Sequence, residues 1–212
     1  MFLIDPLTHA YNNQLQAVID NKTKPLGALG DLESLAKQLC QIQLTKLLAQ
    51  QNQASPETID LTGYTAQINQ PELIVFAGDH GVAAEGVSIA PSEVTSQMVT
   101  NFVHGGAAIN VFCRQLGWQM TVVDAGTLIP PAAGLPVVNQ RLGDITQAIN
   151  VAPAMKRSQV EQGFGYAKAL ITAKVNNGCD LIAFGEMGIG NTTVAAAIMS
   201  AIMNLPASET VG

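Results

Sequence analysis

Three short apolar runs, each ending in a glycine and a carboxylate, constrain the fold of this 212-residue chain most strongly. They are Leu73–Ala77, Met120–Val123 and Leu181–Phe184, followed by Gly78-Asp79, Asp124-Ala125-Gly126 and Gly185-Glu186. Continuous runs of this length are typical of strands buried on both faces of a parallel sheet. The sequence therefore predicts an α/β fold, with ligands binding beyond the carboxyl ends of the strands.

Helical patterns separate these runs. One covers residues 92–116 and is interrupted at Gly105-Gly106, and the other opens with a predicted capping box of Ser158 and Glu161. The second pattern has an apolar face of Val160, Phe164, Ala167, Ile171 and Val175. The segment 128–153 is rich in proline and irregular, so we interpret it as a long connection.

The first 70 residues read as a separate helical region ahead of an α/β domain at 71–212. A helix is predicted from Asp31, as N-cap, to about Gln50, with one buried face that includes Leu32, Leu35 and Ile42. A shorter helix is predicted at 6–19, and Lys22–Gly30 is predicted to be a loop because it contains one proline and two glycines.

Composition excludes several classes of protein. Ten Lys and Arg against sixteen Asp and Glu, with a net charge of -6, leave no basic patch for nucleic acid or an anionic membrane. No apolar run reaches the ~18 residues of a spanning helix, and the N-terminus does not resemble a signal peptide, so we expect a cytoplasmic protein. Cys40, Cys113 and Cys179 read as small buried hydrophobes, and three scattered histidines predict no metal site.

The glycine-rich segment after the third run is the main candidate site. A strand followed by a glycine-rich turn and an alanine-rich helix suits a phosphate, which the first helical N–H groups would bind. It is neither a Walker A loop nor a dinucleotide fingerprint, so a monophosphate fits better than ATP or NAD. A simple tight turn explains the glycines equally well. The predicted phosphate and nucleotide contacts are Met187, Gly188, Ile189, Gly190, Asn191 and Thr192.

Other candidates carry a structural interpretation beside the functional one. Asp79 and His80 suit acid–base chemistry but also suit local hydrogen bonding and capping. The side chains of Ser92, Ser96 and Gln97 could bind the nitrogens of a heterocycle, although Ser92 is also an ordinary N-cap. The candidate counterions for an anionic substrate are Lys22, Lys24 and Arg141, and the expected core residues are Met98, Phe102 and Phe112.

Seven motifs occur in an order that resembles the nicotinate-nucleotide–dimethylbenzimidazole phosphoribosyltransferase family. They are Lys24–Gly30, Phe76–Val82, Gly86-Val87-Ser88 with Val94-Thr95, Gly105–Asn110, Asp124-Ala125-Gly126, Pro153-Ala154-Met155 and Gly185–Thr193. The resemblance spans nearly the whole chain, and the seven motifs together are specific.

The resemblance implies a Rossmann-like parallel sheet flanked by helices, a small helical domain, and a homodimer. The family transfers the phosphoribosyl group of nicotinate mononucleotide to a benzimidazole nitrogen, giving the α-ribazole phosphate used in cobalamin biosynthesis and free nicotinate. No metal or organic cofactor is implied. Residues 186–193 would bind phosphate and ribose, and Ser92 with its neighbours, together with Asp79 and His80, would bind the base.

Two departures from the family pattern are visible. Ala28 replaces the usual serine of the first motif, and family members are longer than this chain. The glutamate regarded as the family's general base would lie beyond Gly212, which leaves Glu186 as the best catalytic carboxylate in the chain. We therefore expect a C-terminally incomplete α/β domain with little transferase activity. The alternatives are a non-catalytic module that binds a nucleotide monophosphate, and the same transfer to adenine or a phenol.

Overall fold

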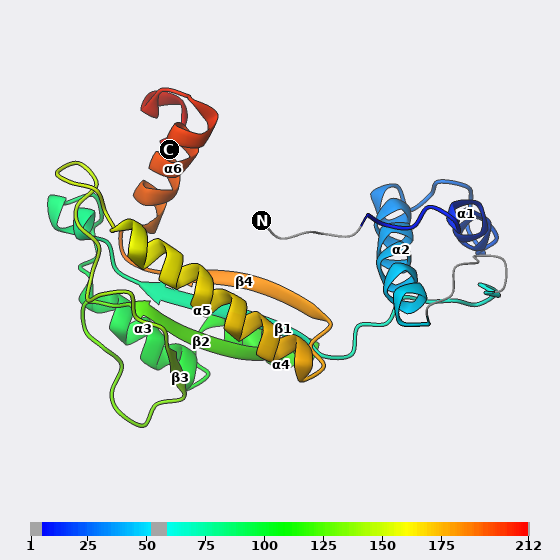
Figure 1. Cartoon of the computed structure of the whole chain (residues 1–212), viewed down its shortest axis with the longest axis horizontal. Coiled ribbons are helices and arrows are strands. Elements are labelled where there is room, and N and C mark those ends of the chain that lie inside the picture. The colour runs from blue at the N-terminus through cyan, green and yellow to red at the C-terminus, as the bar shows by residue number, and fades with distance from the viewer. Residues whose placement is uncertain (1–5, 52–58, 212) are drawn as a thin grey trace. The chain divides into compact units, whose positions relative to one another are not determined.

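A computed structural model describes residues 6–51 and 59–211 and divides the chain into two compact units, Met1–Gln67 and Ile68–Gly212. Figure 1 shows the first unit as helical and the second as a sheet flanked by helices. The second unit confirms the predicted α/β class with a parallel sheet. Nowhere in the described ranges is a helix long and apolar enough to cross a membrane.

The N-terminal unit contains two helices, α1 (Asn12–Asp20) and α2 (Asp31–Gln51), and α1 starts later than the sequence predicted. The core of the unit is a cluster of Tyr11, Leu15, Leu44 and Leu61. The predicted buried face of α2 is wrong at three positions, because Leu32, Leu35 and Ile42 are 62%, 50% and 46% exposed. The nine-residue α1 is too short to cover that much of its longer neighbour.

The sheet of the second unit has four parallel strands in the order β3-β2-β1-β4. The strands are β1 (Pro71–Gly78), β2 (Gln119–Gly126), β3 (Val137–Asn139) and β4 (Leu181–Met187). β3 lies inside the segment predicted to be an irregular connection. Because it is only three residues long and follows Pro136, its sequence gives little strand signal.

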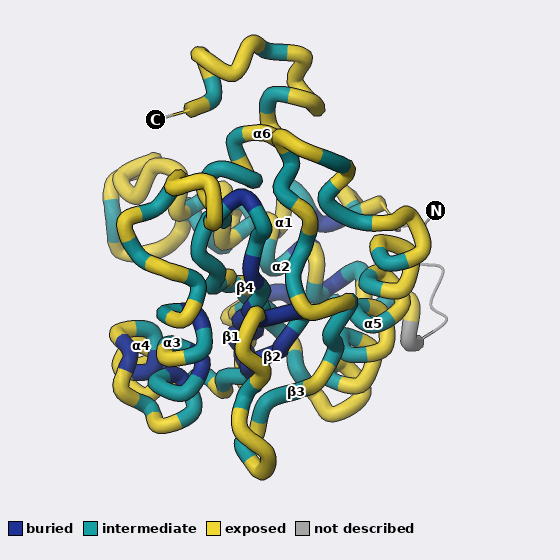
Figure 2. The backbone as a smooth tube through the Cα atoms, turned by 90° about the vertical axis from the view of Figure 1, so that its left-hand side faces the viewer, coloured by how far each residue is buried: buried dark blue, intermediate teal, exposed yellow. Residues whose placement is uncertain are grey.

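Helices lie on both sides of this sheet, with α3 (Glu93–Val103) and α4 (Ala108–Leu116) on one side and α5 (Arg157–Asn176) on the other (Figure 2). The predicted break between α3 and α4 is confirmed. Gly105 has a φ of +78°, in the left-handed region that favours glycine. A Cβ on Gly106 would lie 2.2 Å from the Oδ1 of Asn101, so any larger residue there must displace that side chain.

The main core fills the space between the sheet and α3 and α4. Its buried members are Leu73, Val75, Ala77, Val99, Phe102, Ala107, Cys113 and Val122. Met98 packs against this cluster, so two of the three expected core residues are placed as predicted. Phe112 is not, because it is 60% exposed on the outer side of α4.

α5 begins earlier than the predicted capping box of Ser158 and Glu161. The N–H of Lys156 donates to the side-chain oxygen of Gln159 at 2.8 Å, and Glu161 instead pairs with Arg157 at 2.9 Å. A glutamine can complete the cap as well as a glutamate can, and this explains the shifted start. Phe164, on the predicted apolar face, is 67% exposed.

The remaining regular elements are short or lie near the C-terminal end. α6 (Asn191–Met203) follows β4, and two 3-10 turns, η2 (Gly81–Glu85) and η3 (Ala207–Glu209), complete the unit. Of the cysteines, Cys113 is buried, Cys40 and Cys179 are partly buried, and all three are free thiols. Burial raises the pKa of the Cys40 and Cys113 thiols, as expected for inert packing residues.

Candidate functional site

A cavity of about 230 Å³ opens at the carboxyl ends of β1, β2 and β4. The chain runs from β1 to β2 and β3 on one side, and then places β4 on the other side of β1. Such a reversal of strand order separates the loops that follow the strands and is where α/β proteins bind ligands. The lining residues are Phe76, Ala77, Gly78, Asp79, His80, Ala125, Gly126, Leu142, Gly143, Ile145, Thr146, Met155, Gln159, Glu186, Met187 and Asn191.

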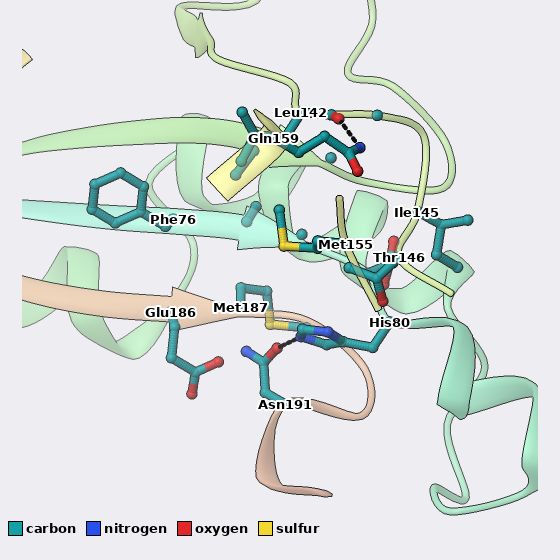
Figure 3. A pocket seen from close by; sticks show the side chains of 16 residues that line it. Phe76, His80, Leu142, Ile145, Thr146, Met155, Gln159, Glu186, Met187 and Asn191 are labelled. Atoms are coloured by element: carbon teal, nitrogen blue, oxygen red, sulfur yellow. Dashed lines mark hydrogen bonds between the residues drawn. The ribbon is translucent and has the colours of Figure 1, made fainter. Parts of the chain in front are cut away.

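The cavity is apolar over most of its wall and polar at one end. Phe76 and Met155 belong to the apolar part, whereas His80 and Asn191 contact each other on the β4 side and Glu186 projects separately from β4 (Figure 3). The His80 Nε2 is hydrogen-bonded to the Oδ1 of Asn191. Since an amide oxygen only accepts, the His80 Nε2 carries the hydrogen of this bond.

Glu186 lies beside Phe76 in the β1–β4 register and is exposed. Within residues 6–51 and 59–211, its carboxylate has no hydrogen-bonding or ion-pair partner. It is therefore a negative charge that a ligand can approach from the cavity.

The glycine-rich loop between β4 and α6 requires its glycines. A Cβ on Gly188 would lie 1.9 Å from the carbonyl oxygen of Gly78 at the end of β1. Gly190 precedes α6 with a φ of +93°, in the left-handed region. The loop consequently passes close to β1 and delivers the N-terminus of α6 next to the cavity, where the first N–H groups of a helix lack intrahelical acceptors.

The wall of the cavity opposite β4 is formed within residues 140–146, and an ion pair attaches this segment to the end of β2. Arg141 Nη1 donates to the Oδ2 of Asp124, at the end of β2, over 2.8 Å, and Nη2 contacts Asp144 at 3.1 Å. Burial acts to lower the pKa of the Arg141 guanidinium, but the hydrogen bond and charge of Asp124, followed by Asp144, raise it overall. Arg141 is thus occupied by the protein's own carboxylates.

Some of the sequence-predicted site residues lie at the cavity, and the others lie away from it. Asp79, His80, Glu186, Met187 and Asn191 line the cavity, and Gly188, Ile189, Gly190 and Thr192 follow in the adjoining loop and first turn of α6. Ser92, Ser96 and Gln97 lie at the start of α3 and are not among the lining residues. Lys24 forms an ion pair with Glu33 at 2.8 Å inside the N-terminal unit.

Sequence reasoning missed the wall formed by Leu142, Gly143, Ile145 and Thr146, because it belongs to the segment 128–153. Met155 could have been identified as a candidate from the sequence, since it ends one of the seven motifs. In the part of the chain that the structure describes, no three His, Cys, Asp or Glu side chains are grouped to hold a metal ion.

Comparison with known proteins gives a consistent match. A family model described as "Phosphoribosyltransferase" matches residues 4–212. The nicotinate-nucleotide–dimethylbenzimidazole phosphoribosyltransferase of Pseudoalteromonas translucida is 54% identical over 212 residues, which is 100% of this chain and 58% of that protein. The enzyme of the same name from Shewanella sp. strain ANA-3 is 53% identical over 212 residues, covering 55% of its length.

Solved structures agree. The crystal structure of CobT from Thermus thermophilus matches with a TM-score of 0.79 and 34% identity, covering 97% of this chain and 56% of that one. A second structure from the same organism, of the phosphoribosyltransferase under its full name, gives a TM-score of 0.78. The chain therefore spans somewhat more than half the length of the relatives it matches.

Proposed function

This chain belongs to the nicotinate-nucleotide–dimethylbenzimidazole phosphoribosyltransferase family, and we propose that it binds that family's substrates at the cavity above β1 and β4. The proposed reaction transfers the phosphoribosyl group of nicotinate mononucleotide to 5,6-dimethylbenzimidazole, giving α-ribazole 5'-phosphate for cobalamin and releasing nicotinate. The observation that carries the proposal is an apolar cavity adjoining a glycine-rich helix start at the reversal of strand order.

The glycine-rich loop is the proposed phosphate and ribose site. Two glycines that cannot carry a side chain bring backbone N–H groups close to the cavity, and the N-terminus of α6 adds its favourable dipole. Backbone donors bind a phosphate without a basic patch, which agrees with the low number of Lys and Arg residues in this chain.

The apolar wall is the proposed site of the benzimidazole ring. Phe76, Ile145 and Met155 offer flat and flexible apolar surface of the kind that holds an aromatic heterocycle. Contacts from Ser92, Ser96 and Gln97 to the base stay a prediction, which Ser96→Ala and Gln97→Ala would test by loss of base affinity.

The transfer forms a bond from a benzimidazole nitrogen to the anomeric carbon and breaks the bond from that carbon to the nicotinate nitrogen. The pyridinium nitrogen takes the bonding electrons, so nicotinate leaves without being protonated, and the benzimidazole N–H proton must pass to a base. Positive charge develops on the ribose, and the Glu186 carboxylate, which lines the cavity, is the group that we propose stabilises it. We propose that His80 and Glu186 are the groups of this chain that interact with the benzimidazole N–H proton.

Titration calorimetry tests the binding proposal directly. We expect the chain to bind nicotinate mononucleotide and dimethylbenzimidazole, and to bind nicotinate riboside, which lacks the phosphate, about tenfold more weakly than the mononucleotide. Phe76→Ala should weaken dimethylbenzimidazole binding about tenfold, whereas Phe164→Ala, at an exposed position of α5, should leave it unchanged. Failure to bind either substrate would overturn the proposal.

A chromatographic assay of nicotinate release separates the transferase from a non-catalytic binding module. Release that depends on dimethylbenzimidazole supports the transferase, and binding without release supports the module. Repeating the assay with adenine and phenols in competition identifies the acceptor. The family resemblance implies a homodimer, which sedimentation velocity would detect as twice the 22.2 kDa of one chain. The sequence predicts a cytoplasmic location, which cell fractionation would detect.

A further inference from the structure

A buried hydrogen-bonded chain connects the end of β1 to the glycine-rich loop. It starts at Asp79, whose exposed fraction is 2%, and both of its carboxylate oxygens already have donors. Oδ1 accepts the hydroxyl of Thr95 in the first turn of α3 at 2.6 Å, and Oδ2 accepts the N–H of Leu128 at 2.8 Å. The side chain therefore joins three separate segments and has little surface left for a ligand.

Thr95 extends this chain to the loop. It is fully buried, and its hydroxyl accepts the N–H of Ile189 at 3.2 Å. A hydroxyl has one hydrogen and two lone pairs, so donating to Asp79 leaves it free to accept from Ile189. The direction of each bond is fixed because a backbone N–H only donates and a carboxylate only accepts.

Ile189 is the point at which this support has the greatest effect. It lies between Gly188 and Gly190, two glycines whose backbones have unusually large conformational freedom when nothing restrains them. Its hydrogen bond to Thr95 fixes the peptide between them, while the hydrogen bond of His80 to Asn191 holds the far end of the loop. Without the Thr95 hydroxyl, the loop would have no side-chain attachment at its centre among the contacts the structure describes.

We propose that Asp79 and Thr95 are positioning residues, which hold the glycine-rich loop in the conformation that receives the nucleotide phosphate. Asp79 thus acts through Thr95 and Ile189, in contrast to the base-contacting role that the family resemblance implied for it. The assignment of the phosphate to this loop rests on the proposed function. Preorganising backbone donors lowers the entropic cost of binding an anion, because the loop need not be ordered on binding.

Hydrogen exchange tests the positioning role without any ligand. Thr95→Val removes the hydroxyl at nearly constant volume, and we expect the Ile189 amide to exchange about tenfold faster relative to the amides of β1. Thr95→Ser keeps a hydroxyl and should restore the original rate. Val99→Ala, a fully buried position one turn further along α3, is the matched control: it should accelerate exchange throughout the unit without singling out Ile189.

An unchanged relative rate at Ile189 in Thr95→Val would overturn the proposal, as would an equal effect of Val99→Ala. If Thr95→Val does not fold, Thr95→Ala removes the same hydroxyl with less bulk and is judged in the same way.

Ligand binding then connects the loop to the nucleotide. Thr95→Val should weaken nicotinate mononucleotide about tenfold, leave nicotinate riboside within twofold, and recover in Thr95→Ser. An equal loss for both ligands would contradict a role in phosphate binding. Faster exchange at Ile189 in a protein whose wild type binds no nicotinate mononucleotide would support the positioning role and overturn the proposed function, so the two failures are distinguishable.

Discussion

β1 lies between two strands, β2 and β4, which are both apolar runs in the sequence but differ in how far their residues are buried. Between β1, β2 and α3, the side chains of Val75, Val99 and Val122 are buried in one cluster. On the side of β4 and α6, Phe184 is 67% exposed and Ile202 is 77% exposed, and no residue of either element is buried, although every residue of both is described. An apolar run therefore predicts a strand reliably without specifying what will cover it.

The uncharged helix α6 likewise shows that an apolar sequence does not specify what covers the element it forms. A helix that is apolar on all sides is normally buried, yet α6 exposes Ile198, Met199 and Met203. The predictions below measure how different the two sides of β1 are, from the largest expected effect to the smallest.

Gly188→Ala should have the largest effect, because the loop that follows β4 passes directly against the end of β1 at this residue. The added Cβ would lie 1.9 Å from the Gly78 carbonyl, so the loop or the strand end must move. We expect a loss of about 3 kcal/mol or more in the free energy of unfolding. Denaturant unfolding checks this value.

Gly165→Ala in α5 is the control for that variant, since a Cβ there meets no atom within 4 Å. It should stabilise the protein by about 0.5–1 kcal/mol. Equal behaviour of the two alanine variants would show that the approach of Gly188 to β1 is not a constraint.

Two phenylalanines compare the two sides directly. Phe102→Ala removes a buried ring from α3 and should cost about 3 kcal/mol. Phe184→Ala removes a mostly exposed ring from β4 and should cost less than about 1 kcal/mol. Thermal and denaturant unfolding would measure both, and similar losses would mean that the β4 side is covered in solution.

Arg141→Met should have an intermediate effect, confined to the β2 side of the cavity. It leaves the Asp124 carboxylate, which is 2% exposed, without its cationic partner. We expect a loss of about 2 kcal/mol, below the range for fully buried pairs because Arg141 is partly exposed. Arg141→Lys should recover part of it, and a neutral result for Arg141→Met would mean that the pair does not hold the cavity wall.

Glu33→Gln should have the smallest effect and provides a baseline outside both regions. The hydrogen bond from Lys24 lowers the pKa of Glu33 below 4.5. The ionised pair therefore stabilises the folded state above pH 4.5, and this contribution disappears as the pH falls through the lowered pKa. Melting temperatures of Glu33→Gln and the wild type should differ slightly at pH 7 and converge at low pH. A difference that grows as the pH falls would contradict the expected direction of this pH dependence.

The sequence predicted the fold better than it predicted burial. The three long strands and the helix break at Gly105 follow from local patterns, because strand runs and glycine breaks act over a few residues. The exposure of Phe112 and Phe164 could not be predicted, since it depends on which elements pack against α4 and α5.

The site was predictable where motifs mark the ends of strands. Asp79, His80 and Glu186 were identified as candidates because a polar residue after a buried run is conspicuous, and the structure brings all three to one cavity. Leu142 and Ile145 were not identified, because they reach the cavity through an irregular loop held by the Asp124–Arg141 ion pair. That long-range contact leaves no periodic signal in the sequence.

The central position of β1 also affects how the protein is made. β1 begins at Pro71, which pairs with Leu181 at the start of β4, so the two paired positions are 110 residues apart in the chain. At the usual 5–20 residues per second, a ribosome needs roughly 5–20 s to synthesise the intervening chain. During that interval one edge of an apolar strand has no partner, and such an edge can pair with another nascent chain. Slow translation across residues 127–180 would therefore lower the yield of folded protein more than an equal delay after β4.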